Sequence, residues 1–189
     1  MTTLHRISMF ERGMGASEHP TAYIPLERTQ SMRQKHFTLT EVKARDGSVL
    51  RLCFADGFSA DVSLAEVIER HPTLHPLREA SVFHRVQTDE WRLGVVFGGN
   101  DDLSLASDTL RAMATEQAGG FSHHQLVTWM AHHGMSLDAG ADALGISRRM
   151  LAYYRSGQKE IPRPIGLAMV GWNVVQARGT QAVLHYNAA

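Results

Sequence analysis

Residues Ser136–Gly157, SLDAGADALGISRRMLAYYRSG, decide the fold that we expect for the second half of this chain. Two short stretches with helical spacing flank Gly145 in this segment. Glycine accepts the left-handed backbone of a tight turn, and Ala141, four residues earlier, is small enough to let two helices nearly touch. The segment is therefore typical of two helices joined by a tight turn, a helix-turn-helix.

Helical spacing also divides the second of these helices into two faces. The positions that should face inward are apolar or aromatic: Leu144, Ile146, Leu151 and Tyr154. The positions that should face outward are Arg148, Arg149, Ala152 and Tyr153. One face therefore packs on the rest of the protein, and the other is free to contact another molecule.

A further helix is predicted before this pair. Ser122 and Gln125 form a capping box, in which each side chain satisfies a backbone N–H of the first turn, and the helix should run to about His133. Its inward residues should be Leu126, Val127 and Met130. Adjacent histidines occupy residues 123–124 and 132–133, and neighbouring side chains on a helix diverge by about 100°. We therefore expect no metal site at either pair.

Another helix is predicted after the pair, from Pro162 to Gly179. The missing N–H of proline is harmless in the first helical turn, and glycine commonly ends helices. An apolar face at helical spacing should pack inward, with Ile165, Ala168 or Met169, Trp172 and Val175. The C-terminal part of the chain is therefore expected to contain four helices.

These four helices resemble the phage-repressor and Cro (XRE-like) family of DNA-binding domains over about residues 122–172. The residues that carry the resemblance are Leu126, Met130, Ser136, Ala141, Leu144, Gly145, Ile146, Ser147, Leu151, Tyr154 and Gly157. Two positions depart from the family pattern. Leu137 stands where the family often has a phosphate-binding glutamine, and Gly140 replaces a core aliphatic residue, which costs about 1 kcal/mol of helix stability plus lost packing.

The resemblance implies that the third helix enters the major groove of double-stranded DNA. Arg148 and Arg149 would then read base edges, because a guanidinium group matches O6 and N7 of guanine. Ala152 would meet a thymine methyl group, and Tyr153 would meet a phosphate or a base edge. The residues that would hold the DNA backbone are Lys159, Arg163, Ser136 and Ser147, the two serines being well placed as N-caps.

Short strands are predicted in the first half of the chain. Leu50, Leu52 and Phe54 alternate with Arg51 and Cys53, which is the period of a strand with one buried face. Asp-Gly pairs precede and follow this strand and favour tight reverse turns. Residues 38–62 should therefore form a three-stranded antiparallel meander.

The pattern continues with a helix, two strands, a turn and a second helix. Ser63 and Glu66 form a capping box for a helix that ends at about Arg70. Strands are predicted over residues 82–87 and 91–97, and the second should place on its core face Trp91, Leu93, Val95 and Phe97. We expect a plain turn over residues 98–102 and a helix over residues 107–117.

This order of elements over residues 38–116 resembles a small bacterial family of domains of unknown function. The resemblance is carried by VLRLCFADGFSADVSLAEVI, HPLREASVFHRVQTDEWRLGVVF and LASDTLRAM. Members of that family stand alone or precede a DNA-binding domain, and some resemble components of toxin–antitoxin operons. The predicted fold class is α+β, a small antiparallel-sheet-plus-helix domain followed by an all-α lambda-repressor-like helix-turn-helix domain. The predicted divisions are an arm at 1–36, the α+β domain at 37–117, the helix-turn-helix domain at 121–179 and a tail at 180–189.

Charge is distributed unevenly along the chain, although its formal net value is zero. Residues 1–40 contain five Lys or Arg and three Asp or Glu, which gives a charge of +2. Residues 41–120 contain eight basic and thirteen acidic residues, which gives −5. Residues 121–189 contain six basic and three acidic residues, which gives +3. The basic excess lies on the helix-turn-helix half, as phosphate binding requires. The acidic middle part should not be the part that touches DNA.

Composition excludes several classes of protein. No run of 18 apolar residues occurs and the first residues lack the apolar segment of a secretory signal, so we expect a cytoplasmic protein with no membrane span. The single cysteine, Cys53, excludes an intramolecular disulfide and a cysteine-based zinc knuckle. The sequence contains no pairing of nucleophile and base and no metal-ligand spacing, so we expect neither an enzyme nor a cofactor.

Two functions are left open by the sequence. The first is a sequence-specific DNA-binding transcriptional regulator, expected to act as a homodimer because one short helix gives little affinity alone. The second is an antitoxin-like or other protein-binding module, in which the acidic region at residues 41–120 binds a partner protein.

Overall fold

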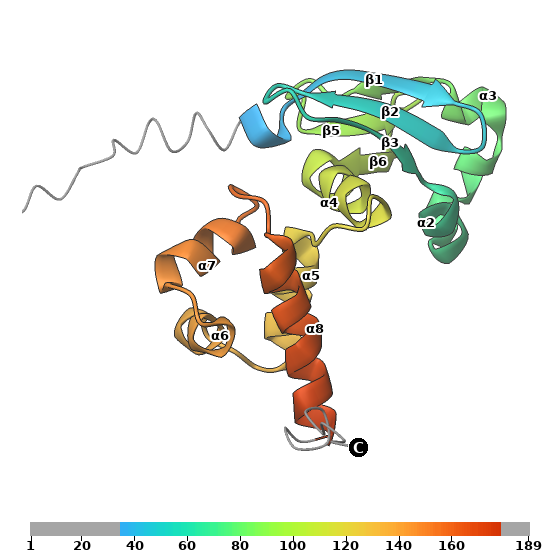
Figure 1. Cartoon of the computed structure of the whole chain (residues 1–189). Helices are drawn as coiled ribbons and strands as arrows, with labels where there is room; N and C mark the ends of the chain where they lie inside the picture. Colours follow the sequence, from blue (N-terminus) through green and yellow to red (C-terminus); the bar gives the residue numbers. More distant parts are fainter. Residues whose placement is uncertain (1–34, 179–189) are drawn as a thin grey trace, which may run out of the picture.

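The computed structural model describes residues 35–178 (Figure 1). The predicted tail, the helix end at Gly179 and all but the last two residues of the predicted arm lie outside the described residues. The first sheet contains β1 (Leu39–Arg45), β2 (Val49–Phe54) and β3 (Ser59–Ser63), which pair antiparallel in the order β1-β2-β3. The meander predicted over residues 38–62 is therefore confirmed, and the alternating Leu50, Leu52 and Phe54 are all buried.

The capping box predicted at Ser63 is wrong. Helix α2 (Ala65–Arg70) ends where the sequence predicted, but its N-cap is Leu64, which makes no side-chain cap. Ser63 is instead the last residue of β3, and the Gln117 side chain binds both its N–H (2.9 Å) and its carbonyl (2.8 Å). Because its backbone is already held by these bonds, Ser63 stays in the strand. A 3-10 helix, η1 (Pro72–Arg78), and helix α3 (Ala80–Phe83) follow.

A second sheet contains β4 (Val86–Thr88), β5 (Gly94–Phe97) and β6 (Asn100–Ala106), paired antiparallel in the order β4-β5-β6. The strand predicted over residues 82–87 is wrong in its first half, because residues 82–83 belong to α3. The turn predicted over residues 98–102 is too long. Gly98 and Gly99 reverse the chain alone with φ of 63° and 72°, so β6 begins at residue 100.

Of the four residues between 91 and 97 that were predicted to face the core, two do so and two do not. Val95 and Phe97 are buried, whereas Trp91 is 75% exposed and Leu93 is 45% exposed. Alternation fails before residue 94 because a turn precedes β5: Arg92 has a φ of 56°, and the carboxylate of Asp89 accepts a hydrogen bond from the N–H of Leu93 (2.9 Å). The two-residue period of a strand therefore applies only to residues 94–97, which form the strand.

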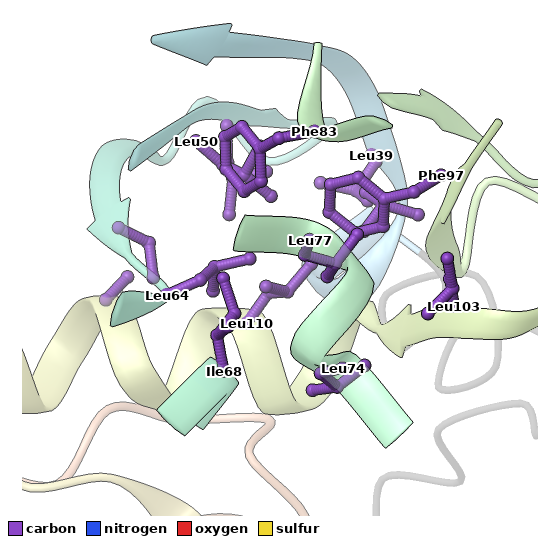
Figure 2. Packing of buried hydrophobic residues seen from close by; sticks show 14 of the residues in the cluster. Leu39, Leu50, Leu64, Ile68, Leu74, Leu77, Phe83, Phe97, Leu103 and Leu110 are labelled. Carbon is purple, nitrogen blue, oxygen red and sulfur yellow. The ribbon is translucent and has the colours of Figure 1, made fainter. Parts of the chain in front are cut away.

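Both sheets contribute to one hydrophobic core, which Figure 2 shows around Leu77 and Leu110. The core takes Leu50 from the first sheet, Phe97 from the second, and Leu110 from helix α4 (Ser107–Gln117), whose bounds match the prediction. The predicted fold class is therefore corrected in its first part. Two separate three-stranded sheets with intervening helices share the core, because β6 completes a second sheet that the sequence did not predict.

Four helices complete the described chain: α5 (His123–His132), α6 (Leu137–Leu144), α7 (Arg148–Arg155) and α8 (Arg163–Arg178). They enclose a second core formed by Leu126, Trp129, Met130, Ala141, Leu144, Leu151, Tyr154, Ile161 and Met169. Helix α4 lies between the sheets and these helices (Figure 1). Val127 does not point inward as predicted but is 39% exposed, and Trp129 packs in the core. Within residues 35–178, no helix is long and apolar enough to span a membrane.

Candidate nucleic-acid interface

The turn between α6 and α7 has the geometry predicted from Gly145. This residue adopts a φ of 65° and a ψ of 31°, and the following N–H of Ile146 donates to the carbonyl of Ala141 (3.0 Å). Both predicted serine caps are present. The Ser136 Oγ accepts a hydrogen bond from the N–H of Ala139 (3.1 Å), and the Ser147 Oγ accepts one from the N–H of Met150 (3.2 Å). Each helix therefore begins at a serine cap, and Gly145 makes the turn between them.

Close packing fixes the angle between α6 and the neighbouring helices. A Cβ at Gly140 would lie 3.0 Å from Cδ2 of Leu151 and 3.4 Å from Cε of Met130. The sequence predicted that glycine at this position would lose packing, and that prediction is wrong, since these two side chains fill the space. The absence of a Cβ lets α6 approach α5 and α7 more closely than an aliphatic residue would.

Arg148 and Arg149 lie on the exposed side of α7, as predicted. Nε of Arg148 lies 3.1 Å from Oδ1 of Asp138, in the first turn of α6. The two side chains are 66% and 72% exposed, and ion pairs between exposed groups contribute little free energy. The Arg148 guanidinium can therefore leave Asp138 for a stronger anionic partner.

Arg149, Tyr153 and Lys159 form one group, which we call the Tyr153 cluster. Nε of Arg149 donates to the Tyr153 hydroxyl (2.9 Å), and its guanidinium carbon lies 5.5 Å from the centre of the tyrosine ring. Nζ of Lys159 lies 5.6 Å from the same centre. Tyr153 and Ala152 were predicted to face outward, and both are half-buried. The ring of Tyr153 thus lies within cation–π distance of two cations.

The remaining predicted contact residues surround α7 without joining this cluster. Ser136 and Ser147 are exposed at the starts of α6 and α7, and Arg163 is exposed as the first residue of α8. Asp138 was missed by the sequence reasoning, although an acidic residue in the first turn of a helix is a visible signal. Its position beside Arg148 makes it part of the same surface.

The end of α7 contacts the part of the chain that precedes the first sheet. A Cβ at Gly157 would lie 2.6 Å from Cζ of Phe37 and 3.3 Å from Cγ of His123. The ring centres of Phe37 and His123 are 5.5 Å apart. Only a residue without a side chain fits there, so the helix pair is positioned against both the start of β1 and the start of α5.

His123 and His124 do not diverge as predicted. Their ring centres are 4.4 Å apart at the N-terminus of α5. The same prediction is wrong for His132 and His133 at the other end of α5, whose ring centres are 4.9 Å apart, because rotation of the side chains brings neighbouring rings together despite the ideal angle between helical positions. Burial, followed by the positive charge of His124, lowers the pKa of His123 to about 4.

Comparison with known proteins gives one similar solved structure. No family model and no curated protein matches the chain. The crystal structure of the "Putative DNA Binding Protein NE0471" from Nitrosomonas europaea is 37% identical with a TM-score of 0.65, over 74% of this chain and 88% of that chain. This share exceeds the length of either predicted domain, so the similarity includes both the sheets and the helices. This similarity replaces the lambda-repressor-like class that was predicted for the C-terminal part alone. At 37% identity over 88% of the other chain, the protein belongs to the family of the Nitrosomonas europaea protein.

Proposed function

We propose that the chain is a sequence-specific DNA-binding transcriptional regulator that places α7 in the major groove as the second helix of a helix-turn-helix. The observation that carries this proposal is the exposure of Arg148 and Arg149 at the first two positions of α7. Residues at the N-terminus of a groove-reading helix reach base edges, and guanidinium groups suit guanine. The name of the Nitrosomonas europaea relative supports a nucleic-acid partner.

Within the Tyr153 cluster, Tyr153 and Lys159 are assigned to the phosphates beside the reading helix, whereas Arg149 is assigned to the bases. Lys159 and the tyrosine hydroxyl can each bind a phosphate oxygen, and Tyr153 contacts both Arg149 and Lys159. Ser136, Ser147 and Arg163 would bind the backbone on either side. Ala152 is half-buried, so its contact with a thymine methyl group is limited to the exposed part of its side chain.

A homodimer belongs to this proposal because a single copy carries little positive charge. The +3 of residues 121–189 is modest for a phosphate-binding surface. Two copies would double both the charge and the number of reading helices, which would then contact half-sites about 34 Å apart. Sedimentation of the protein with and without bound duplex measures the number of copies.

The proposal is tested with duplexes selected from a random pool by the full-length protein. Fluorescence anisotropy then compares wild type, Arg148→Ala and Arg149→Ala on the selected duplex and on a scrambled duplex. We expect each variant to lose on the order of tenfold to a hundredfold in affinity for the selected duplex and much less for the scrambled one. Arg178→Ala, at the last residue of α8, removes the same charge and should keep the preference.

Two results would contradict this assignment. If the pool yields no preferred sequence, the protein does not read bases. If the two α7 variants weaken binding to both duplexes equally, the arginines contact phosphates only, and the salt dependence of both complexes should fall together.

A second candidate function is binding of a basic protein partner through the acidic region. The observation that favours it is Trp91, which is 75% exposed and follows Asp89 and Glu90. Exposed tryptophan surrounded by charge is typical of interface anchors. Purification from the source cell should recover a stoichiometric partner with wild type and with Leu167→Ala, and lose it with Trp91→Ala. Equal recovery by all three proteins would exclude this surface.

A further inference from the structure

Three metal-binding side chains from two helices lie together beside the junction of the two cores. Asp108 is in the first turn of α4, and His123 and His124 are the first two residues of α5. One ligand atom of each residue lies within 4.8 Å of the other two, and all three residues are half-buried. The cluster lies outside the surface assigned to DNA.

We propose that Asp108, His123 and His124 bind a divalent transition metal ion, with Zn²⁺ as the best match. Two imidazole nitrogens and one carboxylate oxygen are a ligand set that zinc accepts, and no thiolate is needed. Three protein ligands leave one position of a tetrahedral ion for water or an exogenous ligand. This proposal does not depend on the DNA-binding function.

The side chains need only a small closing movement to coordinate the ion. Ligand atoms at the usual zinc distances of about 2.0–2.1 Å lie about 3.3 Å apart in a tetrahedron. Pairs separated by up to 4.8 Å therefore approach by an ångström or two, which is within the reach of side-chain rotation at the start of a helix. Oδ1 of Asp108 accepts a hydrogen bond from the N–H of Thr109 (2.6 Å), which orients the carboxylate and leaves Oδ2 for the metal.

The charges around the cluster are compatible with a cation. Arg111 is the nearby cation of α4, but its guanidinium is bound to Asp56 at 2.9 and 3.0 Å and to the carbonyl of His36 at 2.8 Å. Its charge is therefore compensated by Asp56, and Asp108 supplies a negative charge to the metal.

Metal binding would connect the two parts of the protein. Asp108 belongs to a helix that packs on the sheets, whereas both histidines belong to α5, which packs in the second core through Leu126, Trp129 and Met130. His123 also lies against Phe37 and Gly157, at the end of α7. An ion at this position would thus fix α5, and through it α7, to the start of α4.

Isothermal titration of the chelator-treated full-length protein with ZnCl₂ tests the site. We expect one ion per chain, and Asp108→Asn and His124→Gln, which remove direct ligands, should lose more than the roughly tenfold to hundredfold in affinity that loss of an outer-shell partner costs. Asp108→Asn keeps an oxygen for the Thr109 bond, so the fold should be retained, as circular dichroism would verify. His132→Gln is the matched control, because His132 is also half of an adjacent histidine pair on α5.

Co²⁺ provides a second readout that a structural effect would not reproduce. The bound ion should give visible absorption bands of four-coordinate intensity in wild type and in His132→Gln, and these bands should be lost in the two ligand variants. Absence of saturable binding by wild type overturns the proposal. Equal affinity of wild type, Asp108→Asn and His124→Gln, or an equal loss in His132→Gln, also overturns it.

Discussion

Arg148 and Asp138 face each other across the turn between α6 and α7, with Nε of the arginine 3.1 Å from Oδ1 of the aspartate. An acidic side chain therefore lies beside the first residue of the helix that we propose enters DNA. A carboxylate at this position repels phosphate and competes with DNA for the guanidinium group. The free protein must break this pair before Arg148 can contact a base.

Asp138→Asn should consequently tighten DNA binding. Removal of the competing charge releases Arg148, and we expect affinity for a selected duplex to rise on the order of threefold, since exposed ion pairs are weak. Anisotropy titrations at two salt concentrations measure the change. Asp142→Asn, near the end of the same helix, removes an equal charge from a residue that is not the ion-pair partner of Arg148 and serves as the control. An equal gain in both variants would show that net charge, and not the pair, limits binding.

The backbone of Gly145 gives a prediction about stability. A Cβ at Gly145 would meet no atom within 4 Å, so there is space for a side chain. The backbone φ of Gly145 is 65°, however, which is disfavoured for residues other than glycine. Gly145→Ala should therefore lower the free energy of unfolding by about 1–2 kcal/mol. Gly171, inside α8, is also free of contacts but has no positive φ. Gly171→Ala should therefore raise the free energy of unfolding by about 0.5–1 kcal/mol. Urea denaturation compares the two, and changes of the same sign would contradict this explanation.

The sequence correctly predicted those turns, helix caps and strands that depend on residues close together in the chain. The caps at Ser122, Ser136 and Ser147 follow from side chains bonded to nearby backbone, the αL turn follows from the freedom of Gly145, and the meander before residue 63 follows from alternating side chains joined by tight turns. Predictions failed where a distant residue decides the outcome. Ser63 was expected to cap a helix, but Gln117, 54 positions later, holds it in a strand.

Part of the candidate surface was also beyond the reach of sequence. The outward positions of Arg148 and Arg149 follow from helical spacing, but the pair with Asp138 depends on how α6 and α7 cross at the turn. The convergence of Asp108 with two histidines depends on how α4 and α5 meet after residues 118–120. Such contacts between elements have no fixed sequence separation, so periodicity cannot predict them.

Arg111 is a buried cation that pairs with the partly exposed carboxylate of Asp56, and removal of this carboxylate should be costly. The Arg111 side chain is 6% exposed and also lies over the rings of Phe54 and Phe58. Asp56→Asn leaves this guanidinium buried without its anion, so the free energy of unfolding should fall by about 3 kcal/mol. Asp61→Asn is the control, since Asp61 pairs with Arg45 and Arg51 in solvent at 3.4 and 3.5 Å. Its effect should stay within about 0.5 kcal/mol; a comparable loss in both variants would refute the role of burial.

The same pair predicts how stability depends on pH. Burial alone would raise the pKa of Asp56, but hydrogen bonds from Arg111 and the N–H of Phe58, with the charge of Arg111, lower it below the ordinary value of 3.8. A carboxyl group with a depressed folded pKa stabilises the protein above its unfolded pKa and loses that contribution as the pH falls through the folded value. The difference in free energy of unfolding between wild type and Asp56→Asn should therefore shrink progressively as the pH falls below 3.8. Urea midpoints at pH 6, 5, 4 and 3 measure this difference, and a gap that stays constant down to pH 3 would show that the Asp56 carboxylate is not the stabilising form.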